Sequence, residues 1–163
     1  MGVIVREFMN SDIKDAIIIW NYTVESGNIF PQIEKLNERV GIDFFLNQSY
    51  TGVAIEEESN KIIGLYILNP NNIGRQGYIC SVNYAIKCNE RRKHIEEALA
   101  RDSIKKAKEV GFKILQFNEV VNTNTSALSL YEELGFIKLD IIPKGFLRKD
   151  GSCKDIIPYY YNL

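Results

Sequence analysis

The stretch from Gln116 to Phe136 constrains the fold more than any other part of this sequence. Residues that favour strands run from Lys113 to Val121, and an amphipathic helix then runs from Thr125 to Leu134, where Gly135 ends it. A strand that leads at once into a helix is typical of folds in which helices cover the faces of a sheet. The segment therefore predicts an α/β architecture.

The rest of the chain continues this pattern of strands and amphipathic helices. Glu57-Glu58-Ser59-Asn60 predicts the turn of a hairpin, and Tyr78 to Ile86 is apolar on both faces, as expected at the centre of a sheet. We expect an α/β (α+β) fold with a mixed sheet. The expected strands are Val3 to Phe8, Thr51 to Glu56, Lys61 to Asn69, Tyr78 to Ile86, Lys113 to Val121, Phe136 to Leu147 and Asp155 to Asn162; the expected helices begin at the Ser11-Asp12 cap, span Val40 to Leu46, carry Ile95, Leu99 and Ala107 up to Gly111, and span Thr125 to Leu134.

Composition narrows the function classes. A chain of 163 residues has the size of one domain, so we expect a single domain over residues 1–163. The formal net charge of -1 and the absence of a long apolar run argue against nucleic-acid and membrane partners. Three cysteines without CxxC spacing favour neither a disulfide framework nor a zinc site, so a reducing cytoplasm fits best.

Two segments carry candidate chemistry. Three consecutive cations, Arg91 to Lys93, stand where a strand feeds the start of a helix, and such a helix start can bind an anion; a solvated charge run is the alternative. In the second segment Ala127, Tyr131 and Leu134 share one helical face, so Tyr131 is either a core aromatic or a functional phenol. The single histidine, His94, has no partner pattern for a metal, and no metal site is expected.

The spacing of the second segment resembles the signature of the GNAT superfamily of acyl-CoA N-acyltransferases. The likeness extends from about Lys61 to Leu163 and is greatest to a bacterial and fungal subgroup of small-molecule N-acetyltransferases. The residues that carry it are Asn122-x-Asn124-x-x-Ala127-x-x-Leu130-Tyr131-x-x-Leu134-Gly135-Phe136, Pro70-Asn71-x-x-Gly74-Arg75, Arg91-x-Lys93-x-Ile95, Gly111-Phe112, Gln116-Phe117-Asn118-x-Val120-Val121 and Pro143-x-Gly145-Phe146.

The resemblance implies a mixed, mostly antiparallel sheet of about seven strands with about four flanking helices, splayed between the fourth and fifth strands. Acetyl-CoA would enter this splay as co-substrate. Tyr131 would protonate the departing thiolate, since a phenol of ordinary pKa near 10 is protonated at neutral pH. The other residues that the resemblance places on the cofactor are Tyr84, Ala85 and Ile86 through their backbone, Arg91, Arg92, Lys93, His94, Ile95 and Glu96 around the pyrophosphate, and Asn124 and Ala127 beside its arm.

The implied acceptor is the primary amine of a small molecule or an amino acid. Asn118 would orient the amine or its water, and Ser81 stands near the acceptor pocket, where the subgroup tends to have an asparagine. No residue stands out as a general base, which fits direct attack on the thioester in a ternary complex, with water taking the amine proton.

The chain departs from the family at its pyrophosphate loop, where every glycine is replaced within Arg91 to Glu96. Glycine lets the backbone approach phosphates closely, and Glu96 adds a charge of the same sign as the phosphates. Two function classes therefore stay open: an active N-acetyltransferase, and a degenerate domain of the same fold that acts as a binding or sensing module.

Three further groups of residues have less specific expectations. Trp20 is expected in the core rather than as a lid over the acceptor site. Cys80 and Cys88 are expected to be inert thiols. One or two rings of Tyr159-Tyr160-Tyr161 are candidates for a pocket wall or for the seam of a homodimer.

Overall fold

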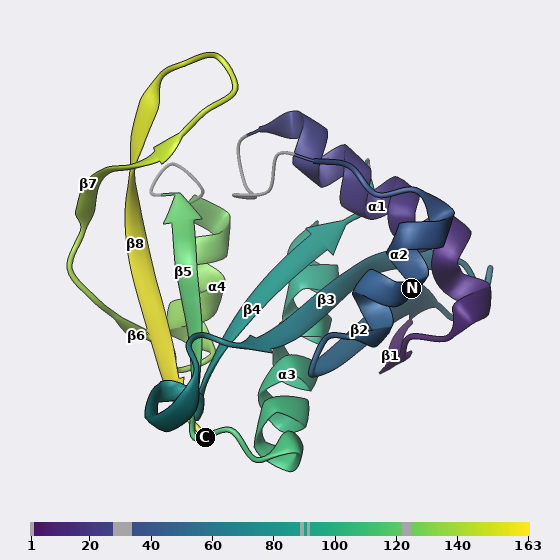
Figure 1. The fold of residues 1–163 in the computed structure, drawn as a ribbon, viewed down its shortest axis with the longest axis horizontal. Helices are drawn as coiled ribbons and strands as arrows, with labels where there is room; N and C mark the ends of the chain where they lie inside the picture. Colours follow the sequence, from purple (N-terminus) through teal and green to yellow (C-terminus); the bar gives the residue numbers. More distant parts are fainter. Residues whose placement is uncertain (1, 28–33, 89, 91, 122–124) are drawn as a thin grey trace.

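The computed structural model describes residues 2–27, 34–88, 90, 92–121 and 125–163, and at positions 92, 93, 118–121 and 126 it describes the backbone alone. The chain forms one eight-stranded sheet in the order β1-β2-β3-β4-β5-β8-β6, with β7 also paired to β8 (Figure 1). The strands are β1 (Val3–Glu7), β2 (Tyr50–Glu56), β3 (Ile62–Pro70), β4 (Ile79–Ile86), β5 (Ile114–Val121), β6 (Ile137–Lys138), β7 (Ile142–Leu147) and β8 (Cys153–Asn162); the helices are α1 (Ile13–Ser26), α2 (Glu38–Leu46), α3 (Arg92–Val110) and α4 (Thr125–Glu133), with short 3-10 turns η1 (Asn10–Asp12) and η2 (Gly74–Gln76).

The first half of the sheet is an antiparallel meander of β1 to β4. The predicted hairpin between β2 and β3 is confirmed, and Asn60 takes a left-handed conformation (φ 55°) in its turn. Both strands are buried along almost their whole length, because helices cover the two faces of this half. The mixed, mostly antiparallel sheet with flanking helices that the sequence predicts is confirmed.

Two hydrophobic clusters lie on opposite faces of the sheet. One lies under α1 and α2 and contains Trp20, which is 1% exposed and packs against Phe44 and Phe45. The placement of Trp20 in the core is therefore confirmed. The other cluster lies under α3 and α4 and contains Tyr131 and Tyr159. α1 and α2 pack on the first half of the sheet. They therefore do not cover the face of β5 and β8 that lies opposite α4 (Figure 1).

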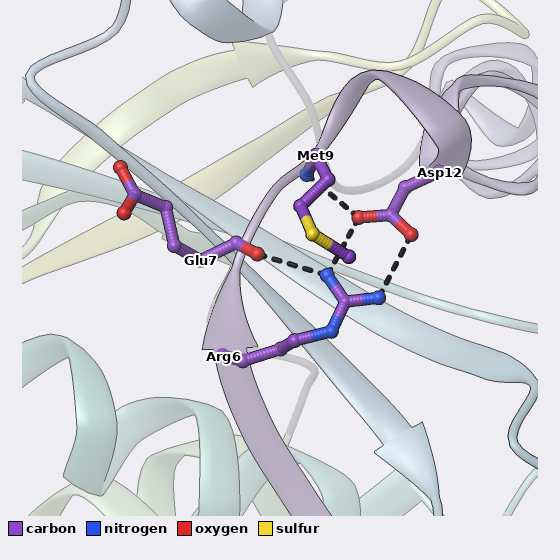
Figure 2. Close-up of polar contacts among 4 residues, drawn as sticks. All are labelled: Arg6, Glu7, Met9 and Asp12. Atoms are coloured by element: carbon purple, nitrogen blue, oxygen red, sulfur yellow. Dashed lines mark hydrogen bonds and ion pairs between the residues drawn. The ribbon is translucent and has the colours of Figure 1, made fainter.

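The start of α1 is held by a charged cluster in the connection from β1 (Figure 2). Arg6 donates two hydrogen bonds to the carboxylate of Asp12, at 2.8 and 2.9 Å, and the backbone N–H of Met9 donates a third at 2.8 Å. Asp12 is 6% exposed, and its side chain reaches back toward Met9 rather than forward onto the helix amides. Burial works to raise the pKa of Asp12, but the hydrogen bonds and the positive charge of Arg6 outweigh it, and the pKa lies below its ordinary value.

The sequence prediction of one strand from Phe136 to Leu147 is wrong. The structure has two strands there, β6 and β7, both paired to β8. Leu139 donates its N–H to the carbonyl of Pro158, but proline has no N–H to return, so the ladder is interrupted at this point. β8 is correspondingly longer than predicted and begins at Cys153.

Candidate active site

The sheet opens between β4 and β5. These strands are parallel, and their register runs from Ile79 opposite Ile114 to Ser81 opposite Gln116. β4 continues to Ile86 and β5 to Val121, yet within the described part of the chain no further pair joins them. The two strands diverge beyond this point (Figure 1). The predicted splay between the fourth and fifth strands is confirmed. Beyond the last pair, the facing backbone groups of β4 and β5 are not hydrogen-bonded to each other.

Tyr131 lies on α4 beneath this opening. It is 6% exposed, and its ring stacks on that of Phe117 from β5, with centroids 4.2 Å apart and 25° between the planes. The Tyr84 ring of β4 lies 6.4 Å away in a stacked orientation. Aromatic side chains from both diverging strands therefore hold Tyr131. Ala127, one turn earlier on the same helix, is also buried.

Tyr84 points toward α3 and not into the opening. Its hydroxyl lies 2.7 Å from Oγ of Ser103, and Ser103 donates its own proton to the carbonyl of Ala100 at 2.8 Å. The Tyr84 hydroxyl is therefore the donor in its bond to Ser103. Burial, and then the proximity of Tyr131, raise the pKa of Tyr84 well above its ordinary value. The side chain of Tyr84 is thus committed to the helix, which leaves the backbone of Tyr84, Ala85 and Ile86 for a ligand in the opening.

The helix α3 begins at Arg92, within the run of cations Arg91 to Lys93 that the sequence places at a helix start. Arg91 lies outside the described residues, as do the side chains of Arg92 and Lys93. His94 is exposed, whereas Ile95 and Glu96 are buried. Ile95 and Leu99 lie one helical turn apart and are both fully buried, so Ile95 faces the sheet.

Glu96 is 8% exposed, and its charge is one of the smaller contributions that raise the pKa of Tyr84. The sequence pattern suggests a carboxylate beside the pyrophosphate but does not indicate whether it is exposed or buried. The structure shows that Glu96 is buried. Asn124 and the side chain of Asn118 lie outside the described residues.

On the opposite face of the sheet, β4 presents a polar stripe. Ser81 and Asn83 alternate with Val82 and Tyr84, so they face away from α3 and α4. Ser81 donates to Oδ1 of Asn71 at 3.1 Å and lies beside Gln116 of β5. Asn83 was missed by the sequence analysis, although strand alternation from Ser81 could have found it.

The arrangement defines a class of protein: parallel strands that splay over a helix-borne tyrosine are the framework of an acyl-CoA-dependent acyltransferase of the GNAT fold. Comparisons with known proteins agree. The model of the Acetyltransferase (GNAT) family matches residues 18–136. The N-acetyltransferase aca1 of Schizosaccharomyces pombe is 28% identical over 159 residues, covering 88% of this chain and 76% of that protein.

Solved structures share the fold along the whole chain. A GCN5-related N-acetyltransferase from Kribbella flavida superposes with a TM-score of 0.87 at 24% identity, covering 99% of this chain and 98% of the other. The protein yncA of Salmonella typhimurium, solved with its cofactor acetyl-CoA, gives a TM-score of 0.90 at 14% identity, covering 100% of this chain and 95% of the other. A phosphinothricin acetyltransferase from Sinorhizobium meliloti in complex with AcCoA gives 0.89 at 17% identity, covering 100% and 89%.

The chain belongs to the acetyltransferase (GNAT) family. This membership makes it an acyltransferase and supports acetyl-CoA as its co-substrate. No helix among the described residues is long and apolar enough to cross a bilayer, and the described His, Cys, Asp and Glu side chains form no group of three that could hold a metal ion.

Proposed function

We propose that the protein is a single-domain N-acetyltransferase that moves an acetyl group from acetyl-CoA to a primary amine of a small molecule or an amino acid. The observation that carries the proposal is the opening between β4 and β5 with Tyr131 beneath it. Backbone edges that diverge in this way expose N–H and C=O groups, which an extended chain with amide groups can satisfy.

The described residues fit acetyl-CoA at the thioester end. The backbone of Tyr84, Ala85 and Ile86 borders the opening and would bind the pantetheine amides. At the other end, amides at the start of α3 and the cations Arg91, Arg92 and Lys93 would bind the pyrophosphate, with His94 exposed beside them. Because Glu96 is buried, its carboxylate would be shielded from solvent at this helix end. Asn124 and Ala127 would flank the arm between the two ends.

The chemistry needs one proton donor and good positioning. The bound cofactor supplies an activated acetyl thioester. The amine nitrogen would attack the carbonyl carbon as the carbon–sulfur bond breaks, and the Tyr131 hydroxyl would give its proton to the departing sulfur. The amine would lose its own proton to water, and water would return one proton to the Tyr131 phenolate. Stacking against Phe117 holds the phenol in place, which reduces the entropy cost of the transfer.

The acceptor amine would enter from the face that carries Ser81. Direct attack in a ternary complex would bring the amine and the thioester together where β4 and β5 are apart. Asn118 of β5 would orient the amine or its water. The cytoplasm suits the protein, since Cys80, Cys88 and Cys153 are all unpaired. Homodimerisation stays a prediction, to be measured by sedimentation.

Two measurements test the proposal. Calorimetric titration with acetyl-CoA should show saturable binding, and acetyl-CoA-dependent thiol release should appear with at least one member of an amine panel. Tyr131→Phe should lower kcat by about 100-fold or more with little change in cofactor affinity. Tyr78→Phe removes a hydroxyl from a half-exposed ring and should leave kcat unchanged.

The alternative is a degenerate domain that acts as a binding or sensing module. It would be favoured by the absence of heat at millimolar acetyl-CoA, and it would be excluded by acetyl-CoA-dependent thiol release with an amine that Tyr131→Phe abolishes. The calorimetric titration should be run first, because the glycines of the pyrophosphate loop are replaced in the Arg91 to Glu96 segment.

A further inference from the structure

The end of β7 carries a half-buried arginine with one side-chain N–H that is buried and has no partner. Arg148 follows the strand directly, and its backbone N–H donates to the carbonyl of Ser152 at 2.8 Å, which closes the turn into β8. The Nε of its side chain is buried and has no hydrogen-bond acceptor within reach, and it is the one such side-chain atom in the described part of the chain. Buried polar groups almost always have partners, so an unpaired guanidinium N–H points to a ligand.

The fold directs this side chain to the acceptor face. Phe146, two residues earlier, packs against Ile156 of β8. Ile157 and Tyr159 of β8 pack in the cluster under α4, and Ile156 lies on the opposite face of the same strand. Phe146 and Ile156 therefore lie on the sheet face opposite α4, and alternation along the hairpin carries Arg148 to the same face. This is the face on which β4 presents Ser81 and Asn83.

The hairpin end also reaches across the sheet to α1. The N–H of Lys149 donates to the carbonyl of Gly27 at 3.3 Å, and its Nζ donates to the carbonyl of Glu25, also at 3.3 Å. Gly27 has a φ of 64°, and a Cβ there would lie 2.4 Å from Cβ of Lys149, so the close approach requires glycine. The tip of the β7–β8 hairpin and the end of α1 thus meet beyond the point where β4 and β5 diverge (Figure 1).

Charge on the hairpin favours an anion. Residues 142–155 contain Lys144, Arg148, Lys149 and Lys154 against Asp150 and Asp155, which is four positive and two negative charges, a net +2 in a chain of net charge -1. The carboxylates of this hairpin are already used. Asp150 accepts from the N–H and hydroxyl of Ser152, and Asp155 accepts from the N–H of Lys144.

We propose that Arg148 binds the carboxylate of the acceptor, so that the enzyme acetylates the amino group of amino acids. The inference rests on the proposed function, because it names the substrate class of the same site. A guanidinium forms paired, charge-assisted hydrogen bonds with a carboxylate, which fixes the orientation of a small molecule as well as its affinity. An amine next to that carboxylate is then held on the face from which it attacks.

The kinetic test uses matched trios, each an amino acid, its amide and the decarboxylated amine, with small, apolar, acidic and basic side chains. The wild type should prefer the acid of at least one trio by about 10- to 100-fold in kcat/KM. Arg148→Gln should remove that preference by raising KM for the acid, with the amide and the amine unaffected, and Arg148→Lys should restore part of it. Arg101→Gln, which alters an exposed arginine paired with Glu97, is the matched control and should change nothing.

The outcomes separate this inference from the proposed function. Acetyl transfer that is equal for acids and amides, or an equal loss for all acceptors in Arg148→Gln, would overturn the role of Arg148 and leave the acetyltransferase intact. If no amine is acetylated, the proposed function fails, and NMR decides on Arg148 by itself. Its Nε–H resonance, assigned with Arg148→Lys, should shift when the acids of the trios are added with CoA and stay still with the amides. No shift with any acid would refute carboxylate binding.

Discussion

The hydroxyl of Tyr159 donates a hydrogen bond to Oε1 of Glu132 at 2.9 Å, and so ties the last long strand of the sheet to the residue next to Tyr131. Tyr159 is fully buried, and its ring contacts that of Tyr131 edge-on at 6.2 Å. Burial, and then the bond to Glu132, raise the pKa of Tyr159 to about 12, so the donor keeps its proton throughout the neutral range. The position of the proposed proton donor thus depends on a strand that is distant in the sequence.

Tyr159→Phe should therefore act on both stability and turnover. Loss of this hydrogen bond should lower the free energy of unfolding by about 1 kcal/mol, measured by urea denaturation. We expect kcat to fall several-fold with unchanged affinity for acetyl-CoA, because α4 loses a restraint one residue from Tyr131. Tyr160→Phe alters a side chain on the other sheet face and serves as the control. An unchanged kcat would show that Glu132 does not help to position Tyr131.

Asp12→Ala should destabilise the protein by about 2 kcal/mol, because it removes the acceptor for Arg6 and for the N–H of Met9. The pKa of Asp12 lies below its ordinary value in the folded state. Its contribution is therefore complete above about pH 4 and is lost as the pH falls through the folded pKa. Urea midpoints measured between pH 2 and 7 should converge for the wild type and Asp12→Ala at the acid end. A constant difference across that range would contradict the assignment.

Tyr66 and Asp102 form a second buried link, between β3 and α3. The Tyr66 hydroxyl donates to Oδ2 of Asp102 at 2.7 Å, and burial raises the pKa of Asp102 although this bond opposes the rise. Tyr66→Phe should cost about 1–3 kcal/mol, since it leaves a half-buried carboxylate without its donor. Asp102→Asn should cost less than Tyr66→Phe, because an amide still accepts the bond. A double-mutant cycle measures the coupling, and additive effects would exclude a direct link.

Cys80 should resist alkylation in the folded protein. It is fully buried on β4, and burial raises the pKa of its thiol to about 12. Iodoacetamide at pH 8 should modify the exposed Cys153 within minutes and Cys80 only after denaturation, as followed by mass spectrometry of intact protein and peptides. Cys153→Ser gives the background. Rapid labelling of Cys80 in the native state would mean that the β4–β5 opening reaches solvent at that depth.

The order of strands and helices was largely predictable from the sequence, because each element carries its own local signal. The polar turn from Glu57 to Asn60 marked the hairpin, the usual burial of tryptophan placed Trp20 in the core, and glycines ended α3 and α4. The break between β6 and β7 was not predictable. It depends on Pro158 of the neighbouring strand, which lies some twenty residues further along the chain, and no local pattern within Phe136 to Leu147 reports it.

The candidate site divides in the same way. The sequence by itself determined that Tyr131 lies on an amphipathic helix that directly follows a strand. It also determined that Ser81 lies on the strand across the opening. Only the tertiary structure decided that Glu96 is buried and that Lys149, next to Arg148, meets the end of α1 at Gly27. Periodicity fixes which side of its own element a residue occupies, but what it faces there depends on contacts between segments far apart in the chain, such as Gly27 and Lys149.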